Sequence, residues 1–286
     1  MEIRHIAIRE GRLSSFLRQE LGLSTGLMNR LKWADKLYVN GIPRHADFPI
    51  AIGDEIIAVL DDPQPQYPAQ QGPLTILYED EHILCVDKPA GMLIHPSRSV
   101  NTGTLANFVL GYYEKTGQSC AFHPVTRLDR DTFGVVLLAK NAHIHALLNA
   151  LHAEGKMQKT YEALVFGVPH PQQGSIDAPI ARLPLPSLLR RVDPEGKPSL
   201  TEYMTAEILD GYSRVTLRPI TGRTHQLRVH MAHIGHPILG DPQYGNKNSL
   251  ELSKKLGIAT QHLCAHKLEF LHPITGQNLS IQTTLI

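Results

Sequence analysis

The segment Arg127-Leu128-Asp129-Arg130 places one carboxylate between two arginine side chains. An apolar run from Val135 to Ala139 follows it closely. Neighbouring guanidinium groups favour the charged form of a carboxylate, so we expect Asp129 to be ionised at neutral pH. Such a group can act as a nucleophile or an electrostatic stabiliser, but not as a proton donor. The alternative is a surface turn whose charges only pair with one another.

A second segment, residues 218–231, combines arginine and histidine with the signals of a helix start. Thr224 is predicted to cap this helix, which places Arg223 just ahead of its N-terminus. A guanidinium at the positive end of a helix dipole attracts anions. We therefore expect Arg223 to hold a phosphate or to pair with a carboxylate such as Asp129. A surface arginine beside a helix cap is the alternative.

The first 60 residues have the pattern of a small unit with two helices and a hairpin. Apolar residues at helical spacing between Leu13 and Leu21 predict one helix, and Ser24 can cap a second. The turn signals Val39-Asn40-Gly41 and Gly53-Asp54 predict short strands after the helices. Residues 61–73 are rich in proline and glutamine, which predicts a semi-rigid linker. The sequence thus predicts a domain at 1–60, a linker at 61–73 and a second domain at 74–286.

The second domain is predicted to contain more strands than helices. Asn141 can cap a helix that ends near Gly155. The strands do not alternate regularly with helices, so we predict an α+β fold with a mixed, largely antiparallel sheet, preceded by the small N-terminal αβ domain. The clearest predicted strands are residues 74–77, 83–86, 160–166 and 214–218.

Composition limits the class of protein further. Of the 286 residues, 42% are hydrophobic and 19% are charged, as in ordinary globular proteins, and no apolar run suits a membrane span. The N-terminal residues lack a secretory signal, so we expect a cytoplasmic protein. Three separated cysteines without a C-x-x-C pair argue against a disulfide scaffold or a thiolate zinc site. A net charge of +1 means that any nucleic-acid surface must be a local patch.

Seven segments follow one another in an order that resembles the RluA-type RNA pseudouridine synthases. Residues 1–60 are similar to the S4 RNA-binding domain that is often attached to these enzymes. The resemblance implies an enzyme that isomerises specific uridines in structured RNA to pseudouridine, with ribosomal RNA favoured over transfer RNA as the partner. The segments are Lys88-Pro89-Ala90-Gly91, His95-Pro96, Thr104-Leu105, residues 125–134, residues 159–163, residues 218–245 and His272-Pro273-Ile274-Thr275-Gly276.

The resemblance also implies the catalytic residues: Asp129, Tyr161 and Arg223. Asp129 would attack the ribose C1′ or assist removal of a proton from C2′, and both routes stay open. Arg223 would orient Asp129, while Tyr161 would stack on the uracil and could assist removal of the C5 proton. Neither a metal nor another cofactor is expected. Two residues depart from the family pattern, Thr126 where histidine is common and Phe133 where serine or threonine is common.

The target nucleotide must leave the helical stack, so we expect binding energy from phosphate contacts elsewhere on the protein. RNA is the expected partner, and no membrane or obligate protein partner is expected. A solvated charged surface is the alternative reading of the basic residues. The predicted RNA-binding residues are Arg12, Arg18, Arg30, Lys32, Lys36, Arg44, Arg127 and Arg130.

Two other classes of protein compete with this hypothesis. A non-catalytic RNA-binding protein could retain the fold, although it would have no need for three catalytic side chains together. A metal-dependent hydrolase is suggested by two groups of histidines, but neither group carries the glutamate of an H-E-x-x-H motif. The groups are His225, His230, His233 and His236, and His143, His145 and His152.

Overall fold

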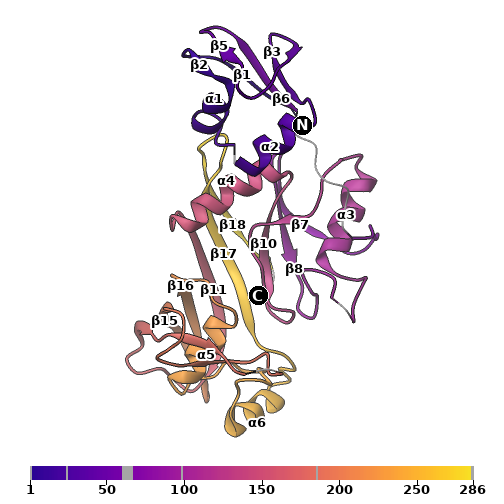
Figure 1. The fold of residues 1–286 in the computed structure, drawn as a ribbon. Coiled ribbons are helices and arrows are strands. Elements are labelled where there is room, and N and C mark those ends of the chain that lie inside the picture. Colours follow the sequence, from indigo (N-terminus) through magenta and orange to yellow (C-terminus); the bar gives the residue numbers. More distant parts are fainter. Residues whose placement is uncertain (1, 24, 60–66, 98, 185, 285–286) are drawn as a thin grey trace.

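The computed structural model describes residues 2–23, 25–59, 67–97, 99–184 and 186–284. The chain forms a small N-terminal unit and a larger α+β unit built on one ten-stranded sheet (Figure 1). Most pairings in this sheet are antiparallel, and β10 pairs with β17 in parallel. The predicted fold class is therefore confirmed. None of the described helices combines the length and the apolar character that crossing a bilayer requires.

The N-terminal unit contains both predicted helices and a four-stranded sheet of order β1-β6-β3-β4. Residues Asn40 and Gly41 turn the chain between β3 and β4 with positive φ angles of 51° and 76°, as the hairpin signal predicts. Strand β1 was not predicted, and the proposed cap Ser24 lies outside the described residues. The elements are β1 (Glu2–Ile6), β2 (Gly11–Arg12), α1 (Leu13–Gln19), α2 (Thr25–Trp33), β3 (Leu37–Val39), β4 (Ile42–Pro43), β5 (Pro49–Ile50) and β6 (Glu55–Val59).

The large sheet has the order β12-β15-β16-β11-β17-β10-β8-β7, with β9 added to β10 and β18 added to β17. A separate hairpin, β13 (Ile180–Arg182) and β14 (Arg190–Val192), extends from the sheet. The sheet strands are β7 (Thr75–Glu79), β8 (Ile83–Lys88), β9 (His123–Pro124), β10 (Phe133–Ala139), β11 (Met157–Phe166), β12 (Gln173–Asp177), β15 (Leu200–Leu209), β16 (Tyr212–Pro219), β17 (Leu263–Leu271) and β18 (Asn278–Gln282).

Two helices cover opposite faces of the half of the sheet that contains β8 and β10. Side chains alternate along a strand, so Val135 and Leu137 pack with helix α4 (Ala142–Ala153). Val136 and Leu138 pack instead with helix α3 (Leu105–Lys115). This arrangement explains why β10 is apolar on both faces. It also fixes the loop before β10, which carries Asp129.

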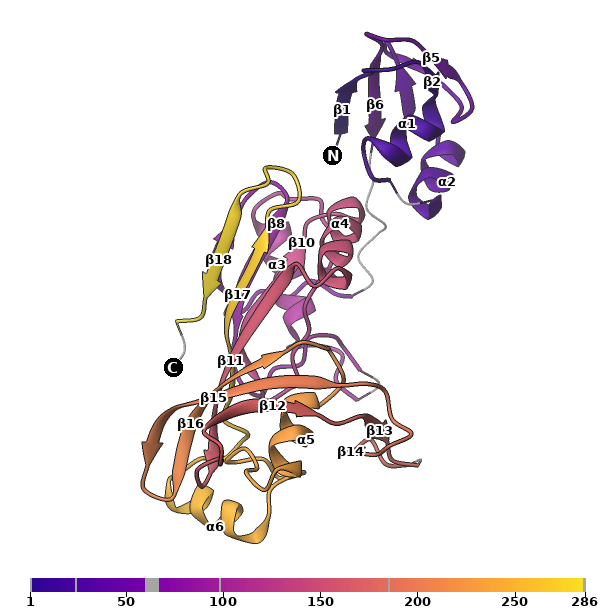
Figure 2. The same cartoon turned by 90° about the vertical axis from the view of Figure 1, so that its left-hand side faces the viewer.

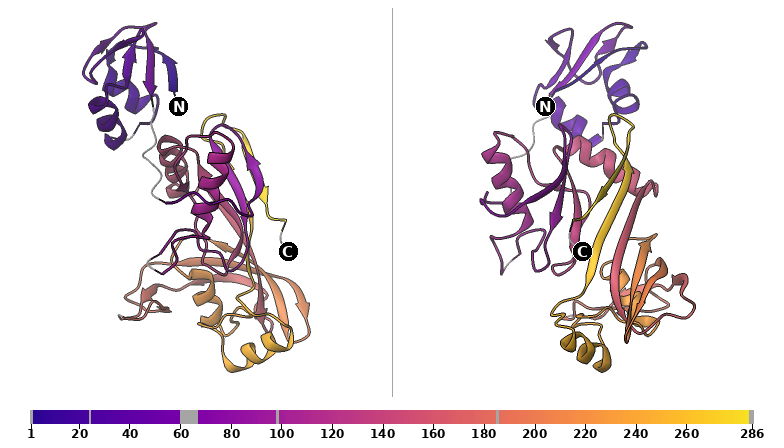
Figure 3. Two further views of the ribbon diagram at one scale, coloured as in Figure 1. Left: turned by 90° about the vertical axis from the view of Figure 1, so that its right-hand side faces the viewer. Right: turned by 180° about the vertical axis from the view of Figure 1, so that it is seen from behind.

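The other half of the sheet has its own helix. Helix α5 (Gln226–His233) packs Leu227 and Met231 against β11, β15 and β16, and helix α6 (Lys247–Lys255) lies at that end of the molecule (Figure 2). Strands β11 and β17 run through both halves, and each contributes side chains to the α4 core and to the α5 core (Figure 3). The two halves are therefore joined by continuous backbone.

Candidate active site

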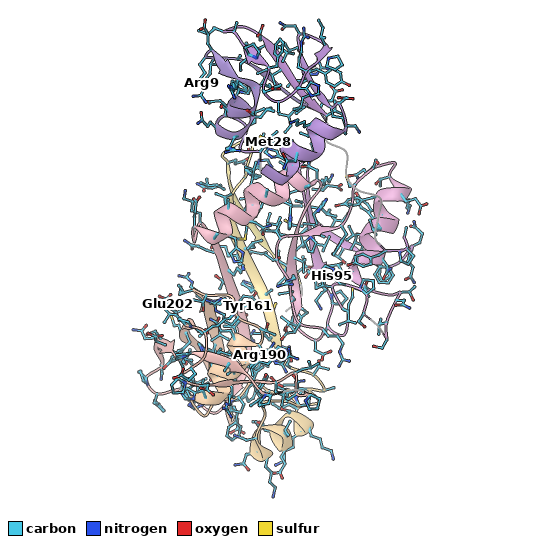
Figure 4. The ribbon with its side chains drawn as sticks, in the orientation of Figure 1. Arg9, Met28, His95, Tyr161, Arg190 and Glu202 are labelled. Atoms are coloured by element: carbon cyan, nitrogen blue, oxygen red, sulfur yellow. The ribbon has the colours of Figure 1, made fainter. Side chains whose placement is uncertain are left out.

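A cleft of about 890 Å³ lies between the two halves of the large unit. The loop before β10, which carries Asp129, lines it from one half, and residues 219–228 line it from the other. Tyr161 of β11 contributes to the lining from the strand that joins the halves. Figure 4 shows Tyr161 near the middle of the molecule, with His95, another lining residue, nearby.

Asp129 is held through one of its two carboxylate oxygens. Arg228 Nη1 donates to Asp129 Oδ2 at 3.0 Å, and His225 Nε2 lies 3.8 Å from the same oxygen. The contacts of the described residues include none to Oδ1. One oxygen is thus fixed by a cation, while the other has its lone pairs available for chemistry.

Arg228 is itself fixed by a second carboxylate. Its Nε and Nη2 donate to the two oxygens of Asp241 at 2.7 and 2.9 Å, and Nη2 also donates to Gln243 Oε1 at 2.7 Å. Burial lowers the pKa of Arg228, but hydrogen bonds and the charges of Asp241 and Asp129 outweigh burial and raise it above its usual value. Arg228 is therefore a permanent, preorganised cation beside Asp129.

Thr224 was predicted to cap helix α5 and Arg223 to pair with Asp129, and both of these predictions are wrong. Helix α5 begins at Gln226, after His225 with a left-handed backbone (φ 59°), so Thr224 does not cap it. The Gln226 side chain accepts instead from the Arg223 backbone N–H at 3.0 Å. Arg223 lies in the preceding loop, where its Nε donates to the Pro198 carbonyl at 3.1 Å. It lines the cleft, but the cation that pairs with Asp129 is Arg228.

The orientation of His225 is set by Tyr244. The Tyr244 hydroxyl accepts from the Arg190 backbone N–H at 3.0 Å and lies 2.8 Å from His225 Nδ1. The hydroxyl can donate its proton to Nδ1 or accept a proton from it, depending on the tautomer of His225. Burial lowers the pKa of His225, and the charge of Asp129 acts in the opposite direction. Nε2 lies 3.8 Å from Asp129 Oδ2, which is beyond hydrogen-bonding distance.

Tyr161 remains protonated in this environment. Burial, followed by the negative charge of Asp129, raises the pKa of the Tyr161 hydroxyl well above its usual value. A neutral phenol can stack on a base and donate a hydrogen bond, but it is not a ready proton acceptor. The site therefore has one clear candidate for the base or nucleophile, which is Asp129.

The loop that carries Asp129 is anchored from beneath by a buried lysine. Lys88 is fully buried, and its Nζ donates to the carbonyls of Pro89, Met92 and Arg130 at 2.9 to 3.0 Å. Burial lowers the pKa of Lys88 to about 8, with the charges of Asp131 and Asp129 acting in the opposite direction. Arg130 is the residue after Asp129, so this hydrogen bond from Lys88 fixes the backbone next to the Asp129 side chain.

The two departures from the family pattern lie in different places. Thr126 is buried, and its hydroxyl accepts from the Leu137 backbone N–H at 2.9 Å, so it helps to hold the loop against β10. Phe133 stacks edge-on against His262 and is not among the residues that line the cleft. Thr126 and Phe133 lie on either side of Asp129 in the chain, and neither side chain is among the described contacts of the Asp129 carboxylate.

The predicted RNA-binding residues occupy two regions. Arg127 and Arg130 line the cleft, and Arg130 also pairs with Asp131 at 3.0 Å. In the N-terminal unit, Arg44 stacks its guanidinium over Phe48 at 4.3 Å. The side chain of Arg30 lies outside the described residues. The others are Arg12, Arg18 and Lys32, which are exposed, and Lys36, which is half-buried.

The histidines of the two groups are distributed among several environments. His230 is fully buried, with its ring nitrogens 2.9 Å from Thr201 Oγ1 and from the Ala178 carbonyl. His236 Nδ1 lies 2.8 Å from the Phe166 carbonyl. Within the described ranges, no three histidine, cysteine or acidic side chains are grouped so that they could hold a metal ion. Among the described residues, histidines that are close in the sequence thus do not form a metal-binding cluster in the structure.

The fold and the cleft define an α+β protein with one carboxylate, Asp129, as the candidate catalytic group, and comparison with known proteins identifies its family. Residues 82–233 match the family described as RNA pseudouridylate synthase, and the chain belongs to this family. It is 36% identical to a Bacillus subtilis (strain 168) protein named uncharacterized RNA pseudouridine synthase YjbO, over 93% of both chains.

Two further relatives extend the comparison. The ribosomal large subunit pseudouridine synthase D of Pasteurella multocida is 39% identical, over 78% of this chain and 70% of that one. The solved structure of human RNA pseudouridylate synthase domain containing 1 has a TM-score of 0.62 and 26% identity, covering 76% of this chain and 86% of the human one. The chain is thus an RNA pseudouridine synthase of the RluA type.

Proposed function

We propose that this enzyme converts specific uridines of large-subunit ribosomal RNA to pseudouridine, with Asp129 as the catalytic carboxylate. The observation that carries the proposal is the asymmetry of Asp129, whose Oδ2 is held by Arg228 while Oδ1 has no contact among the described residues. The choice of RNA is supported by the relatives that are named ribosomal large subunit pseudouridine synthase D.

The reaction breaks the bond from C1′ to N1 of uracil and forms a bond from C1′ to C5, and C5 then loses its proton. Oδ1 of Asp129 can attack C1′ and later be displaced by C5, or it can remove the C2′ proton and return it. In both routes Arg228 stabilises the carboxylate when it leaves or regains its charge. Tyr161 stacks on the uracil while the base turns, which keeps it in the cleft.

The cleft has the charge that an RNA strand requires. Among its described lining residues Asp129 is the one carboxylate, whereas five lining side chains are arginine or lysine. A net charge of +1 for the whole chain conceals this local excess of positive charge. A flipped nucleotide and its phosphates would therefore be attracted to the cleft. The cationic lining residues are Arg127, Arg130, Lys159, Arg223 and Arg228.

The test of the proposed function is direct. Purified protein is incubated with an unmodified transcript of the large-subunit ribosomal RNA, and pseudouridine is mapped by carbodiimide modification and primer extension. We expect new pseudouridine at one or a few positions, without added metal or nucleotide. Unmodified transfer RNA transcripts are assayed in parallel. Pseudouridine in transfer RNA only would contradict the proposed substrate, and no pseudouridine in any transcript would contradict the activity.

We further propose that the N-terminal unit, residues 1–60, is an S4-like RNA-binding domain. Its apolar core consists of residues from within the unit, and the unit approaches α4 where Gly22 lies next to Leu147. Arg12, Arg18 and Lys32 are exposed on it. These cations are placed to contact phosphates at a distance from the chemistry.

Deletion of residues 1–60 is expected to weaken RNA binding and to reduce its salt dependence, because phosphate contacts are lost. Binding is measured by filter retention over a range of salt concentrations, and folding of the remainder by circular dichroism. The variant should unfold cooperatively. An unfolded remainder, or binding with the affinity and salt dependence of the full chain, would contradict the proposed division.

A further inference from the structure

The cleft continues beyond the catalytic residues to helix α4. His145, Asn149 and His152 of this helix are among its lining residues. Their spacing of four and three residues places them on one face of the helix. The proposed reaction at Asp129 uses none of these side chains, so this part of the cleft requires a separate explanation.

Lys159 of β11 contacts this face of α4. Its Nζ lies 2.7 Å from His152 Nε2. An ammonium group can only donate, so the ring nitrogen accepts, and the His152 ring is neutral with its proton on Nδ1. The described contacts of Lys159 include no carboxylate. The half-buried cation therefore faces the cleft with a neutral partner.

Lys140, the residue directly after β10, has the anionic partner that the described contacts of Lys159 lack. Lys140 is also largely buried, and its Nζ donates to Glu79 Oε1 at 2.7 Å. Burial lowers the pKa of Lys159 to about 8, and burial together with the charge of Lys159 lowers that of His152. Desolvated cations are normally paired with an anion, as Lys140 is. Lys159 has no such anion among its described contacts, and a phosphate in the cleft would supply one.

We propose that Lys159 and His152 form a phosphate-binding subsite that holds the RNA backbone next to the target nucleotide. Side chains two residues apart on a strand share a face and lie roughly 7 Å from each other, so Lys159 is the neighbour of Tyr161 in the cleft. A phosphate that flanks a uridine held at Tyr161 and Asp129 is within reach of this ammonium. The subsite rests on the proposed function, which places RNA in the cleft.

The probe for this subsite is a hairpin RNA with a loop of uridines, in which each loop phosphate in turn is replaced by an uncharged methylphosphonate. In the wild type, one such replacement should weaken binding by about tenfold, the size of a lost hydrogen bond to a charged group. In Lys159→Gln, the unmodified RNA should bind about tenfold more weakly, and the same replacement should have no further effect. The slope of log Kd against log salt concentration should fall by about 0.7.

The control variant is Lys156→Gln, because Lys156 lies three residues earlier, is exposed and pairs with Glu154 at 2.7 Å. It should keep wild-type affinity and salt dependence. Thermal unfolding of Lys159→Gln should occur at or above the wild-type temperature, since an unpaired desolvated cation is removed. Equal methylphosphonate penalties in wild type and Lys159→Gln at every loop position would overturn the subsite, as would lower stability with an unchanged salt slope.

Binding and turnover separate the two proposals. The methylphosphonate effect requires no reaction, so it can be observed even if the mapping experiment finds no pseudouridine, in which case only the proposed activity fails. If pseudouridine forms but methylphosphonate replacement weakens binding equally at every loop position, the proposed subsite is refuted and the proposed activity is supported.

Discussion

Asp129→Asn is expected to form pseudouridine about 10⁴-fold more slowly than the wild type, because the amide can neither attack C1′ nor accept the C2′ proton. Asparagine has nearly the same shape, and Arg228 keeps its two hydrogen bonds to Asp241, so the cleft should be preserved. The measurement is a single-turnover assay of tritium release from RNA labelled at C5 of uridine. RNA affinity should stay within about twofold of the wild type.

Asp131→Asn is the matched control for this variant. Asp131 lies in the same loop, pairs with the exposed Arg130 at 3.0 Å and is not among the residues that line the cleft. It should retain wild-type turnover. Residual activity above one tenth of wild type in Asp129→Asn would assign the chemistry to a different group, whereas an equal loss in both variants would indicate a general disturbance of the loop.

Arg228→Met is expected to abolish turnover and also to lower the free energy of unfolding by about 3 to 5 kcal/mol. The substitution leaves the fully buried Asp241 carboxylate without its cation. An unpaired buried charge is strongly destabilising. It also removes the group that fixes Asp129 Oδ2. Stability is measured by urea denaturation and turnover by tritium release.

The double variant Arg228→Met/Asp241→Asn separates these two effects. Asparagine removes the unpaired charge, while its carbonyl can still accept from the Gln243 backbone N–H, which Asp241 Oδ1 accepts at 2.9 Å. Most of the lost stability should return, because neutral replacement of a buried pair costs little. Activity should remain absent. A double variant that regains turnover would show that Arg228 acts only on stability.

Features set by neighbouring residues were predictable from the sequence. The Asn141 cap is an example, since its side chain accepts from the backbone N–H groups of His143 and Ile144 within one turn. The strand predicted at residues 160–166 is another, because the alternation of its side chains is local, and it lies within β11. Strand β1 was missed since its partner β6 is about 50 residues away.

The arginine that pairs with Asp129 was predicted wrongly for the same reason. Asp129 and Arg228 are 99 residues apart, and no local pattern shows which of several arginines reaches the carboxylate. A usable signal was nevertheless present, because Arg228 lies between the apolar residues Leu227 and Val229, and the first six residues of α5 are all buried. An arginine among apolar helix residues needs a carboxylate partner, and that partner is Asp241.

The continuity of β11 and β17 has a consequence for how substrate is selected. Both strands run through the two halves, although the ladder between them shifts register between Thr160 and Glu162. Closing the cleft by moving one half against the other would require these strands to bend. Asp129 and Arg228 are hydrogen-bonded to each other at 3.0 Å, so we expect the nucleic acid to deform more than the cleft. We therefore expect the enzyme to prefer uridines in flexible loops, where unstacking is least costly.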